Sequence, residues 1–194
     1  MYGKSPRATL AIQVERARAR LHAFADWQAD WRQQGYEISD VEFVPDKDHP
    51  VTMADKFLSG RIDRIDRHPT KREIIVFDYK TGKAEPGGAY HKKKEEWSDF
   101  QLPLYHYILR QSGHASSEET IRLGYLSLPT DTQEVAPQWA DWSPDVIQSG
   151  IVCAEKIIKD ILATDWKTVM PNEIPYDKQQ WDDFAAICMC GLRQ

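Results

Sequence analysis

The first hydrophobic pattern along the chain is helical and covers about residues 9–34. Neither glycine nor proline interrupts this stretch, and Gly35 follows it as a helix-ending residue. Apolar residues recur along it at near-helical spacing, so one face of the helix is expected to pack against the rest of the protein. These residues are Leu10, Val14, Leu21, Phe24 and Trp31.

Shorter hydrophobic patterns predict four strands. Residues 37–44 and 57–66 alternate between apolar and polar side chains, which is the pattern of a strand with two different faces. Residues 73–80 are rich in β-branched and aromatic side chains, which is typical of a buried strand, and a turn at 68–71 joins them to the strand before. Residues 121–128 predict the fourth strand.

Two more helices complete the predicted order, at about 98–111 and 144–163. Pro103 is placed in the first turn of its helix, because a proline in a helix interior removes a hydrogen bond and clashes. The polar, glycine-containing stretch 83–97 is expected to be a loop. The order α-β-β-β-α-β-α predicts an α/β fold with a central mixed sheet flanked by helices, in a single domain over 1–194.

Composition supports an ordinary soluble globular protein. Of the 194 residues, 41% are hydrophobic and 28% are charged. The longest apolar run near the centre is Ile74–Phe77, far shorter than the ~20 residues that cross a bilayer, so no membrane partner is expected. Three cysteines are too few for a disulfide framework, and a reducing, cytoplasmic location is predicted.

Charge is distributed unevenly around a net value of −5. Residues 60–94 carry 10 basic and 5 acidic side chains, a local charge of +5 that could attract phosphate. Lys92–Lys94 within this window could contact a DNA backbone, or could simply be a solvated loop. The alternative for the rest of the window is a set of basic side chains that solvate a hairpin: Arg61, Arg64, Arg67, Lys71 and Arg72.

The candidate chemistry centres on two carboxylates and a lysine. Asp78 and Lys80 are two apart on a predicted strand and therefore share a face, and a hairpin can bring Asp63 alongside them. Converging carboxylates are tolerated around Mg²⁺ or Mn²⁺, and the backbone carbonyl of Tyr79 could add a ligand. Lys80 would then orient a metal-bound water or neutralise a phosphate. The alternative is a pair of surface salt bridges across a hairpin.

Three linked segments resemble the RecB/AddB-type nuclease domain of the PD-(D/E)XK superfamily: Gly60-Arg61-Ile62-Asp63-Arg64-Ile65-Asp66, Asp78-Tyr79-Lys80-Thr81-Gly82 and Gln101-Leu102-Pro103-Leu104-Tyr105. The resemblance covers about residues 37–111 and implies a restriction-endonuclease-like core.

The resemblance also implies roles for individual residues. Asp63 and Asp78 would be metal ligands, Lys80 the catalytic lysine, and Gln101 and Tyr105 the helix residues that flank the site. Gln101 and Tyr105 are four apart and share a helix face, where they could hydrogen-bond a phosphate or a metal-bound water. Without the resemblance, they would be interpreted as a buried polar pair tied to the sheet.

At the level of function, the resemblance implies a Mg²⁺- or Mn²⁺-dependent DNA exonuclease or nuclease. Such an enzyme would process DNA ends in double-strand-break repair and recombination, with a helicase subunit or domain as partner. The chain would then be a fragment of a larger helicase–nuclease subunit. The alternative is a non-catalytic DNA-binding or assembly module that retains the fold.

Other acidic and histidine side chains are weaker candidates. Asp46 follows a proline in a loop, and Asp66 lies on the face opposite Asp63, where it is interpreted as a hairpin charge. Glu42 in the first strand is a candidate auxiliary acid. His22 is the only histidine of the first helix and is interpreted as covering a core edge rather than holding a metal.

Related nucleases often hold an iron–sulfur cluster, which needs four well-placed ligands. Here Cys188 and Cys190 are separated by one residue, and no cysteine precedes Cys153. Cys153 itself falls within the last predicted helix and is expected to pack in the core. No complete iron–sulfur cluster is therefore expected in this chain.

Overall fold

The computed structural model describes residues 8–48, 50–80, 85–128, 131–132 and 135–164. The chain divides into two compact units, Met1–Lys159 and Asp160–Gln194. The sheet, the core and the candidate site all lie in the first unit. Cys188 and Cys190 lie outside the described residues, so the structure does not bear on the expectation about an iron–sulfur cluster.

A five-stranded sheet forms the centre of the first unit, in the order β1-β4-β5-β8-β9. Neighbouring strands pair antiparallel except for β5 and β8, which are parallel, so the sheet is mixed as predicted. The strands are β1 (Glu37–Phe43), β4 (Ile62–His68), β5 (Glu73–Lys80), β8 (Thr120–Ser127) and β9 (Pro137–Trp139).

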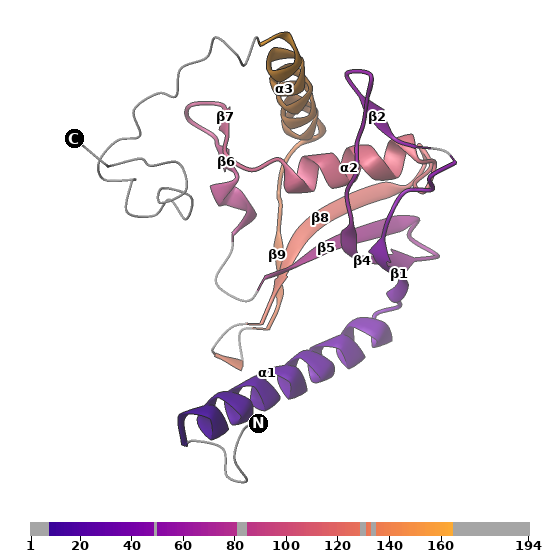
Figure 1. Cartoon of the computed structure of the whole chain (residues 1–194). Coiled ribbons are helices and arrows are strands. Elements are labelled where there is room, and N and C mark those ends of the chain that lie inside the picture. The colour runs from indigo at the N-terminus through magenta and orange to yellow at the C-terminus, as the bar shows by residue number, and fades with distance from the viewer. Residues whose placement is uncertain (1–7, 49, 81–84, 129–130, 133–134, 165–194) are drawn as a thin grey trace, which may run out of the picture. The chain divides into compact units, whose positions relative to one another are not determined.

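Helices cover both faces of this sheet (Figure 1). The first helix, α1 (Ala8–Gln33), lies on one side, and α2 (Gln101–Gln111) and α3 (Pro144–Ala163) lie on the other. α2 connects the parallel strands β5 and β8, because a parallel pair needs a crossover rather than a hairpin. The α/β fold with its central mixed sheet is therefore confirmed.

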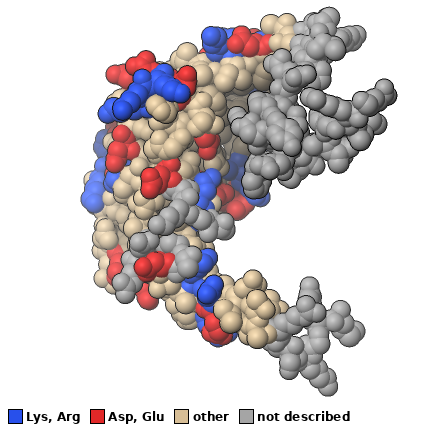
Figure 2. Space-filling model, turned by 90° about the vertical axis from the view of Figure 1, so that its left-hand side faces the viewer, with Lys and Arg blue, Asp and Glu red and all other residues tan. Residues whose placement is uncertain are grey.

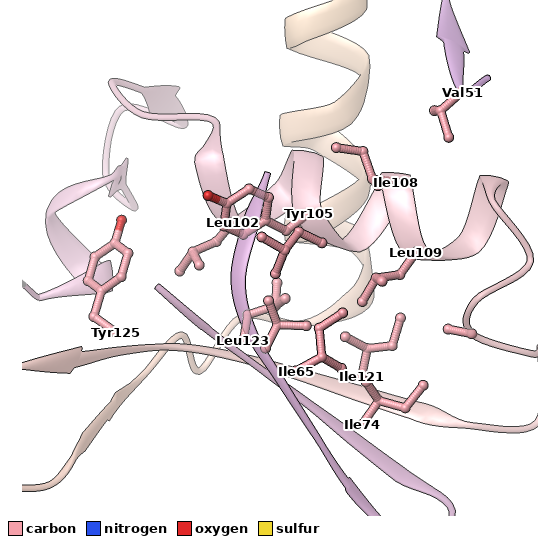
Figure 3. Close-up of a cluster of buried hydrophobic side chains, with 13 residues drawn as sticks. Val51, Ile65, Ile74, Leu102, Tyr105, Ile108, Leu109, Ile121, Leu123 and Tyr125 are labelled. Atoms are coloured by element: carbon pink, nitrogen blue, oxygen red, sulfur yellow. The ribbon is translucent and has the colours of Figure 1, made fainter. Parts of the chain in front are cut away.

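The larger core fills the space between the sheet and α2 (Figure 3). Ile65, Ile74 and Val76 point from β4 and β5 towards Leu102 and Leu109 of α2, and all five are at most 1% exposed. Each such side chain contributes about 1.5–3 kcal/mol when it is fully buried. This packing fixes α2 over the sheet, so that the first turn of α2 is held next to the end of β5.

On the opposite face, Ile75 and Phe77 of β5 pack with Trp31 of α1. Trp27 stacks on Trp31 with ring centroids 5.5 Å apart and meets Phe77 edge-on, so the tryptophan pair packs against the sheet. The prediction that one face of this helix packs along its whole length is wrong for the part up to Leu21. Leu10, Val14 and Leu21 are exposed, because α1 packs on the sheet only from Phe24 onwards.

A buried ion pair lies on this same face. Arg64 and Asp66 are 1% and 0% exposed, and the guanidinium binds both carboxylate oxygens at 2.7 Å. The indole nitrogen of Trp31 donates to Asp66 at 2.7 Å. Asp66 does lie on the face opposite Asp63, but it is a buried partner of Arg64 and not a hairpin charge.

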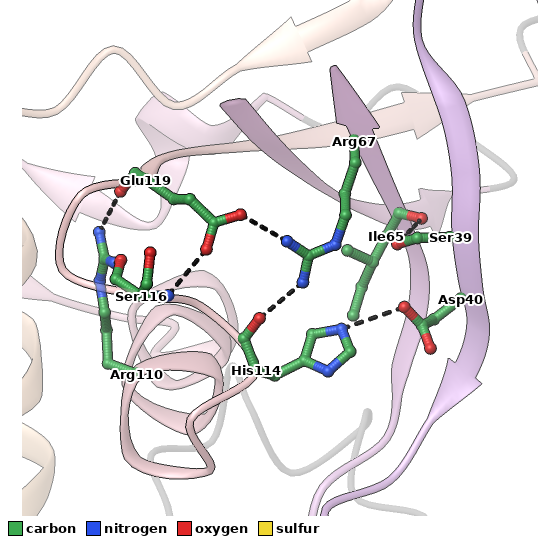
Figure 4. Close-up of polar contacts among 8 residues, drawn as sticks. All are labelled: Ser39, Asp40, Ile65, Arg67, Arg110, His114, Ser116 and Glu119. Atoms are coloured by element: carbon green, nitrogen blue, oxygen red, sulfur yellow. Dashed lines mark hydrogen bonds and ion pairs between the residues drawn. The ribbon is translucent and has the colours of Figure 1, made fainter. Parts of the chain in front are cut away.

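A polar network around Arg67 and Glu119 connects the strands where β4 ends and β8 begins (Figure 4). The guanidinium of Arg67 donates to Glu119 and to the carbonyl oxygen of His114, both at 2.6 Å. Glu119 also accepts the backbone N–H of Ser116 at 2.8 Å, and His114 contacts Asp40 at 3.0 Å. These contacts tie β1, β4 and the α2–β8 connection together.

Two predicted elements have different bounds in the structure. The strand predicted over 57–66 begins only at Ile62, because Leu58 donates its backbone N–H to Val51 and so continues a separate hairpin, β2 (Thr52–Met53) with β3 (Lys56–Phe57). The loop predicted over 83–97 contains, in its described part, the short helix η1 (Pro86–Gly88) and the hairpin β6 (Tyr90–His91) with β7 (Glu96–Trp97).

The remaining boundaries agree closely with the predictions. β5 matches the predicted range, Pro103 lies in the first turn of α2, and Gly35 ends α1 with φ 94°. A side chain at Gly35 would also collide with the ring of His68, 2.8 Å away. In the part of the chain that the structure describes, we find no helix with the length and apolar character of a membrane span.

Candidate active site

The site forms where β4 and β5 separate. The last residues that pair in their ladder are Arg64 and Phe77. Asp63 and Asp78 are the next residues on each strand, and they lie on the face that α2 covers because side chains alternate along a strand. The hairpin predicted from the sequence therefore brings the two carboxylates to the same end of the sheet.

The Asp63 carboxylate binds the neighbouring strand directly. Its Oδ2 accepts the backbone N–H of Tyr79 at 2.9 Å. The N–H and C=O of one strand residue point to the same edge, so the carbonyl of Tyr79 also faces the gap beside Asp63. This orientation is compatible with the predicted ligand role of that carbonyl, which stays a prediction.

Asp78 is the most enclosed acid of the site, with 3% of its surface exposed. Its Oδ1 accepts the Gln101 amide at 2.5 Å and the Tyr105 hydroxyl at 3.3 Å. Its Oδ2 lies 2.6 Å from Nζ of Lys80, yet no described donor forms a properly directed hydrogen bond to it. Burial raises the pKa of the Asp78 carboxyl, Lys80 opposes that rise, and the charge of Asp63 adds to it.

Gln101, the first residue of α2, connects the other polar groups. Its amide nitrogen donates to Asp78 and, at 2.9 Å, to Tyr105, while its oxygen accepts Nζ of Lys80 at 2.9 Å. The Tyr105 hydroxyl donates to the carbonyl oxygen of Arg61 at 3.0 Å, and burial raises the pKa of Tyr105 to about 12. Tyr105 is buried and Gln101 is partly buried, and the pair is tied to the sheet and also holds Asp78 and Lys80.

Sequence reasoning missed two residues at the edge of the site. Asp99 accepts the backbone N–H of Gln101 at 2.8 Å and thereby caps the first turn of α2. The Tyr125 hydroxyl reaches the other oxygen of Asp99 at 3.4 Å, and Nζ of Lys80 lies 4.8 Å above the Tyr125 ring. Asp99 lies inside the helix predicted over 98–111, and reading it as a capping residue would have moved the predicted start to Gln101; Tyr125 has no comparable signal.

The weaker candidates are engaged elsewhere. Glu42 forms an ion pair with Arg61 at 2.7 Å, and Asp46 accepts the backbone N–H of Asp48 within its own loop. His22 is exposed on α1, which packs against the other face of the sheet, so it does not cover a core edge as expected.

The site residues fit a hard divalent cation. Oδ2 of Asp78 is a buried anionic oxygen that lacks a directed donor, and the charge of Asp63 works against its ionisation. Carboxylate and carbonyl oxygens are the ligands that Mg²⁺ and Mn²⁺ prefer, and Mg²⁺ keeps several waters. No cluster of three His, Cys, Asp or Glu side chains suited to a metal occurs in the described ranges, so Asp63, Asp78 and the Tyr79 carbonyl are the protein groups that would hold the ion.

The comparison with protein families gives a match over nearly the whole chain. The model of the PD-(D/E)XK nuclease superfamily matches residues 3–194. A search of curated proteins found no match to the chain. The mixed sheet flanked by helices agrees with the restriction-endonuclease-like fold of this superfamily, and Asp78-Tyr79-Lys80 supplies the D-x-K part of its name. Because the match spans far more than half of the chain, the protein belongs to the PD-(D/E)XK nuclease superfamily.

Proposed function

We propose that the protein is a Mg²⁺- or Mn²⁺-dependent deoxyribonuclease that hydrolyses phosphodiester bonds at Asp63, Asp78 and Lys80. The observation that carries this proposal is the convergence of two carboxylates and a lysine around Gln101 at one end of the sheet. A scaffold has no physical reason to bury an acid beside a second acid, with an ammonium group as the nearest partner of one carboxylate oxygen and no directed hydrogen bond to it from the described residues.

Each residue of the site has a separate task in this proposal. Asp63 and Asp78 hold the cation, which when bound would supply an activated water and offset negative charge at the phosphate. Lys80 is held by Gln101 and Asp78 at a position where its ammonium group can contact a phosphate oxygen or orient the attacking water. Gln101 and Tyr105 fix the orientation of Asp78, since both bind its Oδ1.

The biological setting is a further part of the proposal. The resemblance of the three motifs to the RecB/AddB type supports DNA end processing in repair and recombination, as an exonuclease with a helicase subunit or domain as partner. The small number of cysteines supports a cytoplasmic location.

One observation favours a second candidate, a non-catalytic module that binds DNA or organises an assembly. Asp99 at the edge of the site is engaged by Gln101 and Tyr125, and among the described residues no group of three acidic, histidine or cysteine side chains suited to a metal is found. A site with two side-chain ligands could bind a metal too weakly for catalysis.

Calorimetric titration of Mn²⁺ combined with cleavage of labelled DNA on the same samples separates these candidates. The variants are Asp78→Asn and, as a matched control, Asp46→Asn, an exposed loop aspartate that accepts the backbone N–H of Asp48. Metal binding and cleavage that vanish together in Asp78→Asn but persist in Asp46→Asn would support the nuclease. Metal binding without cleavage in the wild type would favour the second candidate, and cleavage by Asp78→Asn at the wild-type rate would reject the site.

A further inference from the structure

The hairpin before α2 carries an exposed group of lysines that the proposed catalytic residues leave unused. β6 and β7 pair through Tyr90–Trp97 and His91–Glu96, and the backbone N–H groups of Lys94 and Glu95 close the turn onto the carbonyl of His91. Lys92, Lys93 and Lys94 lie in this turn and are all exposed. We call residues 92–94 the lysine turn.

The lysine turn differs from the four arginines of the window 60–94. Arg61, Arg67 and Arg72 form ion pairs with Glu42, Glu119 and Glu118, and Arg64 is buried against Asp66. The arginine charges of this window are therefore neutralised by partners in the folded protein. Within the described part of the chain, none of the three side chains of the lysine turn has an acidic partner.

The base of the hairpin is packed firmly against the helices. The Trp97 indole nitrogen donates to Ser149 of α3 at 3.1 Å, and its ring meets Trp142 edge-on with centroids 5.0 Å apart. A Cβ at Gly150 would lie 2.9 Å from the Trp97 ring, so the indole fits closely against α3. The lysine turn is thus carried on an anchored support and not on a free loop.

The hairpin is also joined to the site by a short connection. Lys94 precedes Gln101 by seven residues, so the two lie at most about 25 Å apart at ~3.6 Å per residue. Phosphates follow one another every ~3.4 Å along one strand of B-form DNA, and the lysine turn therefore lies within about seven phosphates of the site.

On the face shown in Figure 2, basic side chains gather in patches beside acidic ones rather than spreading evenly.

The site itself is a poor binder of polyanions. Asp63, Asp78 and Asp99 are acidic, and the one lysine among them, Lys80, is paired with Asp78. A nucleic-acid chain thus needs positive charge nearby, outside the site. The lysine turn provides this charge. Its three lysines are followed by one acidic residue, Glu95, and the next acid, Glu96, pairs with His91 in the β6–β7 ladder.

We propose that the lysine turn binds the phosphodiester backbone of the nucleic-acid substrate a few nucleotides from the bond that is cleaved. This inference rests on the proposed nuclease function. It assigns the binding of the strand beyond the reacting phosphate to the β6–β7 hairpin.

The test is the salt dependence of oligonucleotide binding, measured by fluorescence anisotropy without divalent metal. Removal of three phosphate contacts lowers the slope of log K against log salt by about 2 on single strands and about 3 on duplexes. The variant Lys92→Ala/Lys93→Ala/Lys94→Ala is expected to show this loss and to weaken binding by about tenfold or more at low salt. The ratio of variant to wild-type Kd should be larger for a 16-mer than for a 4-mer.

Two controls separate charge from structure. Lys92→Arg/Lys93→Arg/Lys94→Arg keeps the charge and should keep the slope, while Lys156→Ala, an exposed lysine of α3, removes one charge elsewhere. If the wild type cleaves DNA and the alanine variant keeps the wild-type salt slope, this inference is overturned while the proposed nuclease function stands. A wild type that neither cleaves nor binds would overturn both, and equal losses in the alanine and arginine variants would show that the lysine charges are not responsible.

Discussion

Asp78 shows at the scale of one residue how a site can oppose the stability of its own fold. Its pKa in the folded protein is raised above the unfolded value, mainly by burial, so the stabilising contribution of the neutral form is lost as pH rises through the folded pKa. The ionised carboxylate therefore destabilises the metal-free protein at neutral pH. The Asp78→Asn variant cannot carry this charge and is expected to melt at or above the wild-type temperature without metal, and to lose the rise that Mn²⁺ produces in the wild type.

Arg64 and Asp66 form a buried ion pair in which each charge needs the other. Removing one charge should therefore cost more stability than removing both. Arg64→Met leaves the fully buried Asp66 carboxylate without its cation and should cost about 3–5 kcal/mol of unfolding free energy. The double variant Arg64→Met/Asp66→Leu removes both charges and should recover part of that loss. Urea denaturation measures both values, and a double variant less stable than Arg64→Met would contradict this account.

At the scale of elements, α2 organises the site because its first two turns supply Gln101 and Tyr105 while its apolar side chains fill the larger core. The β6–β7 hairpin approaches the same end of α2, where Trp97 lies within 6.1 Å of the Phe100 ring. The close fit of α3 against this corner decides how precisely the hairpin is held.

Gly150→Val tests that fit. A Cβ at this position would lie 2.9 Å from Cζ2 of Trp97 and 3.0 Å from Cγ of Pro103, so the side chain must displace one of them. We expect a loss of about 1–3 kcal/mol in unfolding free energy from overpacking. Gln148→Val, an exposed position on the same helix, is the matched control for the β-branched side chain and should stay within about 0.5 kcal/mol of the wild type. Equal effects of the two variants would show that the corner tolerates the added volume.

At the scale of the whole molecule, acids in different surroundings give opposite responses to pH. The pKa of Glu119 is lowered, first by the hydrogen bond from the backbone of Ser116 and also by Arg67. Its contribution to stability is therefore present above the unfolded pKa and is lost as pH falls through the lower folded pKa. Asp78, with its raised pKa, changes in the other direction over the acidic range.

Glu119→Gln should accordingly make the protein less stable at pH 7 by about 1 kcal/mol, because the charged hydrogen bonds to Arg67 and Ser116 are weakened. The difference from the wild type should shrink as the pH falls below the folded pKa of Glu119. Urea denaturation at neutral and strongly acidic pH measures both. A difference that stays constant with pH would show that Glu119 acts by packing and not by its charge.

The sequence by itself determined much of the framework of this protein and indicated its candidate site. The strand over 73–80 could be predicted because a run of β-branched and aromatic residues acts locally, whereas the helix predicted from about residue 98 begins at Gln101. Asp78 and Lys80 share a face because they are two apart on a strand, but it was the three linked motifs that singled out Asp63, Asp78 and Lys80 as a candidate site. The family match over residues 3–194 agrees with the nuclease superfamily that the three motifs indicated, whereas the RecB/AddB type stays a prediction.

Only the tertiary structure decided which charges face solvent and which meet a partner. Arg64 and Asp66 look like hairpin charges in the sequence, and the packing of α1 on the sheet buries them together. Glu118 and Glu119 lie some fifty residues after the arginines that they neutralise, a distance that no local pattern can span. The lysine turn stands out only after these pairs are known, because burial and long-range pairing depend on how distant segments meet in the fold.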